Sequence, residues 1–414
     1  MVAQWSAEVY SRVQRRDVAL LAALRGASFL GDAVALVALY LRVAPVGHAW
    51  AVAALAIAGS LPLVVLAPLA GHVVDRLAAK RFLVLLGLVE ALVCVGLGHW
   101  HGVAATIALM VALNVAVAFS LPGYSALLPA AAGEENVARS QGLLQSVQGV
   151  AMVAGPVLGG LLVGWVGQSW PLYLDACSFA VGALATTLVH HDRRPSASSS
   201  LNALESPRMM AGVSLIVGDD LLRPLIINVA VFMLSLGMAN VAEVFFITQT
   251  LHGSATAYGL VGASFGLGTI IGSVVAGRLS QDQMRLARAL TVAVVVVGLC
   301  IGTAGLVTHL AYFYAPLLVA GIAVGIANVS AMTLFTLRTP EGLRGRMFAA
   351  LGAIITGAEL GSTALGGLVL TVLAPRTVFQ FAGVGSSVSA VVLGAVALRA
   401  SGLAHERERD LHGA

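Results

Sequence analysis

Charge is scarce in this chain of 414 residues. Asp, Glu, Lys and Arg together make up 10% of it, and lysine occurs once, as Lys80. So few charges cannot cover an ordinary water-soluble domain with a polar surface. Aromatic residues are also few, at 6%, whereas 59% of the residues are hydrophobic and the mean hydropathy is +0.94. The composition excludes an ordinary soluble domain and predicts a protein whose solvent is the bilayer.

Cysteine and histidine provide no recognisable site for a metal or for covalent catalysis. The cysteines are far apart in apolar runs and lack metal-ligand spacing; they are Cys94, Cys177 and Cys300. The histidines lie mainly near the expected membrane surfaces, without Cys or acidic partners at ligand spacing. No phosphate-binding loop or nucleophile motif occurs in a credible context. We therefore expect no enzyme activity, no metal and no cofactor, and no coupling to ATP within this chain.

The chain does contain twelve long apolar runs. A run of about 20 residues lets a helix cross roughly 30 Å of hydrocarbon. The runs lie at residues 18–41, 50–70, 82–100, 103–122, 140–165, 170–189, 224–248, 256–277, 288–308, 312–337, 347–373 and 377–398. They use most of the chain and predict an all-α integral membrane protein with twelve transmembrane helices.

Basic residues are distributed unevenly over the connections between these runs. Twenty of the 23 Lys and Arg residues fall in the even-numbered connections and the termini, whereas the odd-numbered connections hold only Arg42 and Arg376. Because basic loops stay cytoplasmic, this predicts that both termini are cytoplasmic. The dominance of Arg over Lys is typical of a GC-rich bacterial genome, which favours a bacterial inner membrane. The net charge of +4 forms no continuous basic stripe, so we expect no nucleic-acid partner.

The apolar runs stop between His190 and about Leu221, where a basic and Ser-rich stretch predicts a cytoplasmic linker over 191–221. The predicted organisation is a six-helix bundle over 1–190, a second bundle over 222–400 and a cytoplasmic tail over 401–414. Sliding the sequence by 206 residues aligns glycines of the two halves, including Gly31 with Gly237 and Gly155 with Gly361. Matched small residues favour matched helix packing, and hence two pseudo-symmetric bundles. Secondary transporters share this architecture and bind substrate near the midplane.

The connection between the second and third runs carries a family resemblance. Residues 71–81 read Gly-His-Val-Val-Asp-Arg-Leu-Ala-Ala-Lys-Arg. This resembles the signature loop of the major facilitator superfamily, a glycine followed by three variable residues, Asp-Arg and a basic cluster. A small residue suits the tight turn, and an acid can face a helix N-terminus. The resemblance implies that Gly71, Asp75 and Arg76 help to hold the two bundles together in the outward-facing state.

A second element points to the exporter branches of the same superfamily. Residues 155–160 read Gly-Pro-Val-Leu-Gly-Gly, similar to the Gly-Pro-x-x-Gly-Gly element of those branches. Such a helix can bend and pack closely, so we expect Gly155 and Pro156 to serve the conformational change. Two expected loops, 122–129 and 340–346, look like those of the subgroup that includes the enterobactin exporter and related drug exporters. Many proton-coupled drug antiporters place an Arg in the fourth helix, where this chain has Asn114.

Ionisable residues inside the apolar runs are the candidates for function, because an acid at the bilayer centre costs about 2.5–3.5 kcal/mol on insertion scales. Asp32 lies in the middle of the first run, and Arg25 lies two turns earlier on the same face. We expect Asp32 to bind a proton or a cationic substrate; the alternative is a structural ion pair with Arg25. Glu359, and Glu243 near the outer end of its run, are further candidates.

Two other acids are interpreted as structural or solvated. Glu90 lies in the third run, which is peripheral in the major facilitator fold, so a structural hydrogen bond is expected there. Asp175 lies near the outer end of the sixth run, where water can solvate it.

Asparagines on helices that the resemblance places at the cavity complete the predicted binding surface: Asn114, Asn228, Asn240 and Asn328. Asn228 and Asn240 lie near one helical face, with Phe232 four residues from Asn228. A large apolar cavity with a few acids and amides suits amphipathic or lipophilic molecules better than sugars. Helix packing could use the same amides.

The predicted function is the export of drug-like compounds or a secreted metabolite by alternating access, as a proton antiporter. The expected partners are a small-molecule substrate, the proton and membrane lipid, and the resemblance implies a single chain. One alternative is a lipid or lysolipid flippase of the same fold. The other is a membrane signalling or assembly protein that has lost transport.

Overall fold

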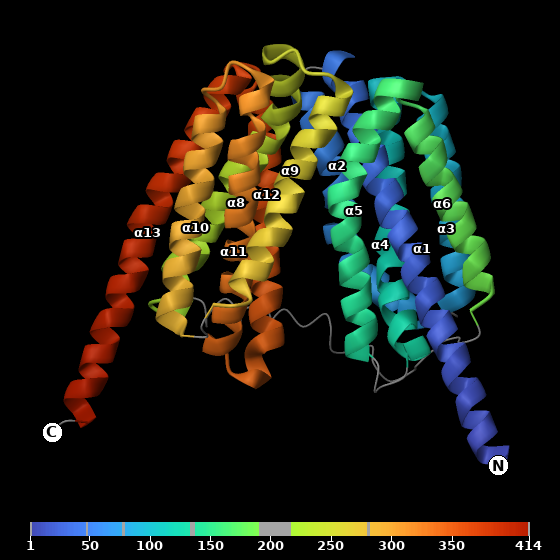
Figure 1. The fold of residues 1–414 in the computed structure, drawn as a ribbon, viewed down its shortest axis with the longest axis horizontal. Helices are drawn as coiled ribbons and strands as arrows, with labels where there is room; N and C mark the ends of the chain where they lie inside the picture. Colours follow the sequence, from blue (N-terminus) through green and yellow to red (C-terminus); the bar gives the residue numbers. More distant parts are fainter. Residues whose placement is uncertain are drawn as a thin grey trace. The chain divides into compact units, whose positions relative to one another are not determined.

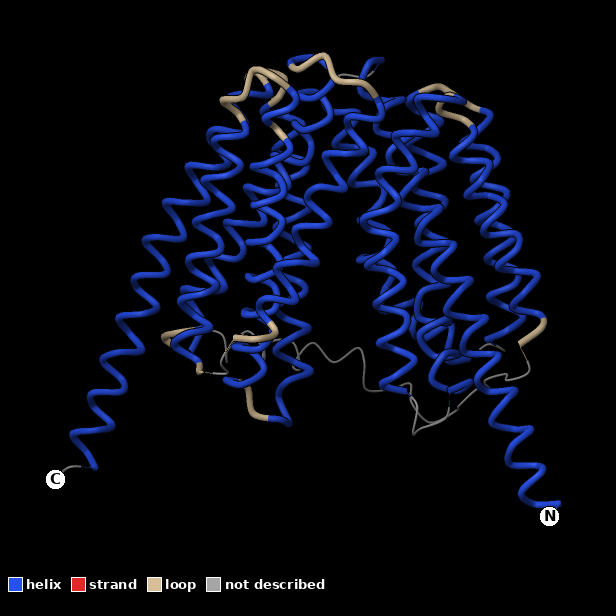
Figure 2. Tube along the Cα trace, in the orientation of Figure 1, coloured by secondary structure: helices blue, strands red, loops and turns tan. Residues whose placement is uncertain are grey.

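The structure is a computed structural model that describes residues 2–46, 49–76, 79–132, 137–189, 217–279 and 282–412. Helices joined by short loops make up these ranges, and no strand occurs within them (Figures 1 and 2). The helices of the first half are α1 (Val2–Val46), α2 (Ala49–Arg76), α3 (Ala79–His99), α4 (Val103–Ala132), α5 (Val137–Val166) and α6 (Trp170–Thr187). Those of the second half are α8 (Leu222–Phe245), α9 (Ala255–Ala276), α10 (Gln283–Ala304), α11 (Tyr314–Arg338), α12 (Arg344–Val369) and α13 (Pro375–His412).

Eleven of these twelve helices are long and apolar enough to cross a membrane. The remaining one, α6, has 18 residues and includes Asp175 on its buried side. Short helical turns complete the described part: a π-helix, η2 (Phe246–Thr250), and two 3₁₀ turns, η3 (Leu310–Tyr312) and η4 (Glu341–Leu343). The predicted all-α architecture of twelve helices is confirmed.

The chain divides into two compact units. The first unit comprises Met1–Gly47, Ala54–Leu204 and Ala255–Ala263, and the second comprises His48–Ala53, Glu205–Ser254 and Ser264–Ala414. The predicted linker over 191–221 stays a prediction, because residues 190–216 lie outside the described part. The predicted bundle limits at residues 190 and 222 stay a prediction.

The same packing pattern occurs in both units. In the first unit, α1 packs against α5 and α6, and α3 packs against α4 and α6. In the second unit, α8 packs against α12 and α13, and α10 packs against α11 and α13. Counting helices from the start of each half makes these the same pairs, which supports the internal repeat. Individual glycines do not repeat their contacts, because Gly155 packs against Ala33 whereas a Cβ on Gly361 would meet nothing within 4 Å.

Several boundaries differ from the prediction. Residues 122–129 were expected to form a loop, but they lie within α4. Prolines at positions 122 and 129 do not end this helix, because neighbouring helices can satisfy the backbone groups that a proline frees in a membrane. The helix α1 begins at Val2, and α13 continues to His412, through most of the predicted tail.

In the second unit, α11 packs with its backbone in contact with the part of α9 that follows Ala263. A Cβ on Gly268 would lie 3.0 Å from the Cα of Gly321, and a Cβ on Gly272 would lie 2.7 Å from the carbonyl carbon of Ile322. On the opposite side of the contact, a Cβ on Gly325 would lie 2.7 Å from the backbone nitrogen of Ser273. Small residues spaced four apart thus permit this close crossing.

The two basic residues of the odd-numbered connections bind backbone carbonyls. Arg42 is 5% exposed; its Nη1 donates to the Leu97 carbonyl at 2.5 Å and its Nη2 to the Gln168 carbonyl at 3.2 Å. Arg376 Nη2 donates to the Val307 carbonyl at 3.0 Å. Both guanidinium groups therefore connect a helix end to a neighbouring segment. This structural role explains why two basic residues occur in the odd-numbered connections, which otherwise have none.

We expect Arg42→Met to destabilise the first unit. The substitution keeps an apolar stem but removes hydrogen bonds from a charged donor, each worth about 1.5–3 kcal/mol. Thermal unfolding in detergent, followed by intrinsic fluorescence, should show a lower midpoint. Arg285→Met is the control, because Arg285 is exposed and its ion pair is a local one, with Asp282 at the start of its own helix, at 3.6 Å. Equal midpoints for the two variants would contradict the assigned role.

Candidate proton and substrate sites

Four ionisable side chains come together inside the first unit. Arg25 and Asp32 lie on α1, Glu90 on α3 and Asp175 on α6. Arg25, Glu90 and Asp175 are 7%, 2% and 0% exposed, and Asp32 is half-buried. Asp32 interacts electrostatically with Arg25, Glu90 and Asp175. The structure therefore extends the expected pair of Asp32 and Arg25 into one buried cluster with a single cation.

Arg25 is held mainly by aromatic rings. Its guanidinium carbon lies 4.5 Å from the ring centroid of Phe29 and 4.8 Å from that of Tyr124. Within the described part of the chain, no ion pair of 4.0 Å or less involves Arg25. A desolvated cation–π contact can contribute about 2 kcal/mol. Asp32 is thus not locked in a close ion pair with Arg25.

Asp175 is buried, and the expectation that water solvates it is wrong. Its Oδ2 accepts a hydrogen bond from Cys94 Sγ at 3.5 Å, and its Oδ1 accepts one from Ser178 Oγ at 3.3 Å. The carboxylate also lies against Gly31, where an added Cβ would overlap Oδ1. The physical reason is that Asp175 lies on the face of α6 that turns into the first unit. The glycine at position 31 is needed to admit this carboxylate beside α1.

The helix α5 packs against α1 next to Asp32. An added Cβ on Gly155 would overlap the side chain of Ala33, and a Cβ on Gly159 would lie 3.0 Å from the carbonyl oxygen of Val34. Pro156 lies between these glycines, and its carbonyl contacts Gly259 of the α9 segment that belongs to the first unit. The predicted conformational residues Gly155 and Pro156 thus lie at close helix contacts. Gly71, Asp75 and Arg76 lie in the last turns of α2, and their side chains are outside the described part.

The remaining predicted site residues have different surroundings. Asn114 is 8% exposed and donates to the Met110 carbonyl of its own helix at 2.9 Å, as a packing residue does. Glu243, Asn240 and Glu359 belong to the second unit and so are not part of the acidic cluster. Glu243 is half-buried, and Asn240 and Glu359 are exposed.

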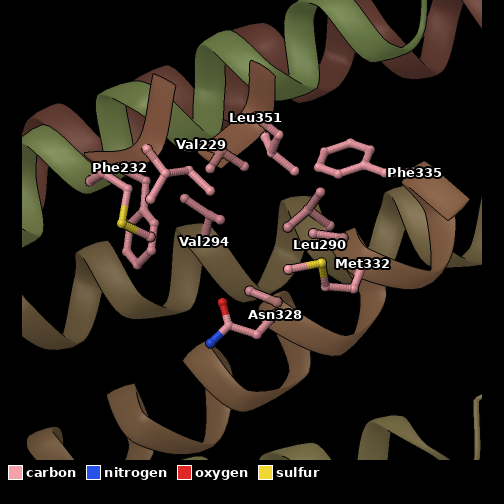
Figure 3. A pocket seen from close by; sticks show the side chains of 12 residues that line it. Val229, Phe232, Leu290, Val294, Asn328, Met332, Phe335 and Leu351 are labelled. Atoms are coloured by element: carbon pink, nitrogen blue, oxygen red, sulfur yellow. The ribbon is translucent and has the colours of Figure 1, made fainter. Parts of the chain in front are cut away.

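Asn328 lines a pocket in the second unit (Figure 3). Apart from Asn328, the pocket is apolar, and its walls come from α8, α10, α11 and α12: Val229, Phe232, Met233, Leu290, Val294, Ala327, Ala331, Met332, Phe335, Leu351 and Ile355. Its accessible space is about 50 Å³. A pocket for a whole drug-sized ligand needs roughly 300–1,000 Å³, so this one fits only an apolar portion of such a molecule.

The family follows from the sequence as well as the fold. The sequence matches the model of the Major Facilitator Superfamily over residues 19–235 and 225–413. The chain belongs to this superfamily. Its members are membrane transporters rather than enzymes, and the resemblance found in the sequence is confirmed.

Relatives by sequence include transporters described as exporters. The chain is 28% identical to the enterobactin exporter EntS of Citrobacter koseri over 64% of this chain and 63% of that protein. It is 20% identical to macrolide efflux protein A of Streptococcus pyogenes over 75% of this chain and 78% of that protein. It is 25% identical to the uncharacterized MFS-type transporter y4rN of Sinorhizobium fredii, over 81% and 84% of the two chains. These relatives support a transporter of the drug and siderophore branch.

Solved structures share the fold. The nucleoside transporter NupG aligns with a TM-score of 0.69 at 15% identity, over 92% of this chain and 98% of that chain. A bacterial homolog of the human lysosomal transporter Spinster aligns with a TM-score of 0.67 at 14% identity, over 94% and 97% of the two chains. At these identities the likeness establishes the fold alone.

Proposed function

We propose that this multi-pass membrane protein exports small amphipathic or lipophilic molecules across the bacterial inner membrane by alternating access, driven by proton antiport. Both termini lie in the cytoplasm and one chain is the working unit in this proposal. The enterobactin exporter and macrolide efflux protein among its relatives support export of drug-like compounds or a secreted metabolite. The basic loops support the orientation.

The observation that carries the proposal is the placement of Asp32. It is a half-buried acid in the middle of a membrane helix. Asp32 interacts electrostatically with Arg25, but the two side chains form no ion pair of 4.0 Å or less. A coupling group must exchange its proton with water and must also respond to a neighbouring charge. In the proposed cycle, Asp32 binds a proton or a cationic substrate, and the two compete.

The apolar pocket supports the substrate class. Phe232 and Met332 offer an aromatic face and a polarisable thioether, and Asn328 offers one amide. Thioethers adapt to differently shaped apolar groups, as a transporter of varied substrates requires. In this proposal the pocket holds the lipophilic part of a substrate, and an amide hydrogen bond orients it.

Filling the pocket tests this assignment. Ala331→Trp adds bulk at the pocket wall, and we expect the transport of ethidium, a lipophilic cationic dye, to fall by about tenfold, which corresponds to about 1.4 kcal/mol. Proteoliposomes with an imposed pH gradient provide the measurement. Val292→Trp is the control, because it adds the same bulk at an exposed position on α10. A buried position such as Ala304 would not serve, because tryptophan there would disturb the packing. Unchanged transport by a well-folded Ala331→Trp variant would remove the pocket from the substrate path.

The proposed cycle also has an assay that separates it from the flippase alternative. Dye accumulation should require the pH gradient. Movement of a fluorescent lysolipid without any gradient, together with no dye accumulation, would favour the flippase. No ligand-dependent stabilisation across a broad compound panel would instead favour a protein that has lost transport.

A further inference from the structure

A small polar cavity lies beside the acidic cluster in the first unit. Its lining includes Arg25 and Ser28 from α1, Glu90 from α3, Tyr124 from α4 and Ser178 from α6. Two of these side chains have a buried oxygen with no hydrogen-bond partner among the described residues, namely Oε1 of Glu90 and Oγ of Ser28. Glu90 is 2% exposed and Ser28 is 6% exposed. Buried polar atoms of this kind are rare and point to a ligand that satisfies them.

The size of the cavity limits what that ligand can be. Its accessible space is about 10 Å³. A buried water molecule needs about 10–15 Å³ measured in this way, together with two to four polar partners. The cavity therefore has room for one water molecule and excludes any organic substrate.

The charges around Glu90 favour at least one neutral carboxyl group in the cluster. The groups that interact with it are Arg25 and Asp32 on α1 and Asp175 on α6. The titratable Tyr124 on α4 and Cys94 on α3 also interact with it. If all three carboxyl groups were ionised, a single guanidinium would face a net excess of two negative charges inside a membrane-embedded bundle. Such uncompensated charge is far more costly than a neutral acid with hydrogen bonds.

The hydrogen-bond partners of Glu90 and Asp175 differ. Ser120 Oγ donates its single hydrogen to the Val117 carbonyl at 3.3 Å. The hydroxyl oxygen also lies within hydrogen-bonding reach of the Glu90 carboxyl. A hydroxyl can donate or accept, so Ser120 can serve either protonation state of Glu90. Asp175 accepts hydrogen bonds from Cys94 and Ser178, whereas Glu90 Oε1 accepts none from the described residues, which favours Glu90 as the neutral acid.

We propose that Glu90 is a proton-binding residue and that one internal water molecule, held between Glu90 Oε1, Ser28 Oγ and the Arg25 guanidinium, completes the hydrogen bonding of its carboxyl group. The site gives the first unit a second proton position besides Asp32. Its use during transport rests on the proposed function, but its existence does not.

Infrared spectroscopy of the purified full-length protein tests the site without a transport assay. We expect the wild type at neutral pH to show the carbonyl stretch of a buried carboxylic acid, shifted by deuterium oxide. Labelling with isotope-substituted glutamate should move this band, which assigns it to Glu rather than to Asp32 or Asp175. The band should be lost in Glu90→Gln and kept in Glu359→Gln, because Glu359 is exposed.

Ser28→Ala tests the water. It removes one partner of the water but leaves the acid, so the band should persist at a shifted frequency, as expected for a changed hydrogen bond. If Glu90→Gln does not fold, a labelled Glu band that persists in Glu243→Gln still assigns the proton to the more deeply buried Glu90. A wild type without a Glu acid band, or a band that Glu90→Gln leaves unchanged, overturns the proposal. An unshifted band in Ser28→Ala overturns the water bridge. Failure of transport in Asp32→Asn bears on the proposed function and does not affect any of these outcomes.

Discussion

Asp32→Asn is expected to remove the pH dependence of substrate binding. In the proposed cycle a proton and a cationic substrate compete for Asp32, so the affinity of the wild type for ethidium should rise as the pH is raised and the acid loses its proton. Asparagine has nearly the same shape and stays neutral at every pH. The variant should therefore bind weakly, with the affinity that the wild type has at low pH, and show no pH slope.

The size of this effect follows from the free energy that couples two sites. Coupling free energies are typically about 1–3 kcal/mol, which corresponds to roughly 5–150-fold in affinity. A change in that range should separate the wild type at high pH from the wild type at low pH and from Asp32→Asn. Dye binding followed by fluorescence anisotropy over a pH series gives the slopes. In proteoliposomes, the variant should lose gradient-driven accumulation and keep counterflow, which needs no net proton movement.

Asp220→Asn is the matched control for this experiment. Asp220 is exposed just before α8 and pairs with Arg223 in the first turn of that helix at 3.7 Å. Removing its charge should leave the pH slope in place. If Asp32→Asn keeps a slope equal to that of Asp220→Asn, Asp32 is not the coupling residue, and the proposed antiport needs another acid.

The sequence predicted helices and their approximate bounds well because membrane spans depend on local properties. Twenty apolar residues form a helix in lipid whatever the rest of the chain does. The same local rule failed at residues 122–129, where two prolines suggested a loop. Whether proline ends a helix depends on neighbouring helices that can satisfy the freed backbone groups, and these neighbours are not visible in a local pattern.

The acidic cluster was only partly predictable. Asp32 and Arg25 lie two turns apart on one helix face, so the sequence predicted that the two side chains interact. Asp175 lies on another helix, and its position near the helix end suggested solvation. A signal was present in the buried face of α6, where Leu172, Asp175 and Phe179 recur at a helical period. A helical-period test of the short sixth run would have placed Asp175 inside. Its contact with α1 at Gly31 depends on tertiary packing, which spacing cannot provide.

Gly272→Ala is expected to have the largest effect on stability. Alanine in place of an interior helical glycine normally stabilises a helix by roughly 0.5–1 kcal/mol. At Gly272 the added Cβ would overlap the carbonyl oxygen of Ile322 in α11. Overpacking commonly costs about 1–3 kcal/mol, and more where backbone must move. The clash should therefore exceed the gain, with a sharp loss of monodisperse protein and a lower thermal midpoint in detergent.

Comparison with two other glycines separates backbone clashes from side-chain clashes. An added Cβ on Gly361 would meet nothing within 4 Å, so Gly361→Ala should be neutral or stabilising. An added Cβ on Gly26 would overlap only the side chain of Val147, so Val147→Ala should restore the stability that Gly26→Ala loses. Ile322→Ala should not rescue Gly272→Ala, because the obstacle is a backbone oxygen that the substitution leaves in place. Rescue by Ile322→Ala would show that α9 and α11 are held apart by side chains, and that the close backbone contact between them is absent in the folded protein.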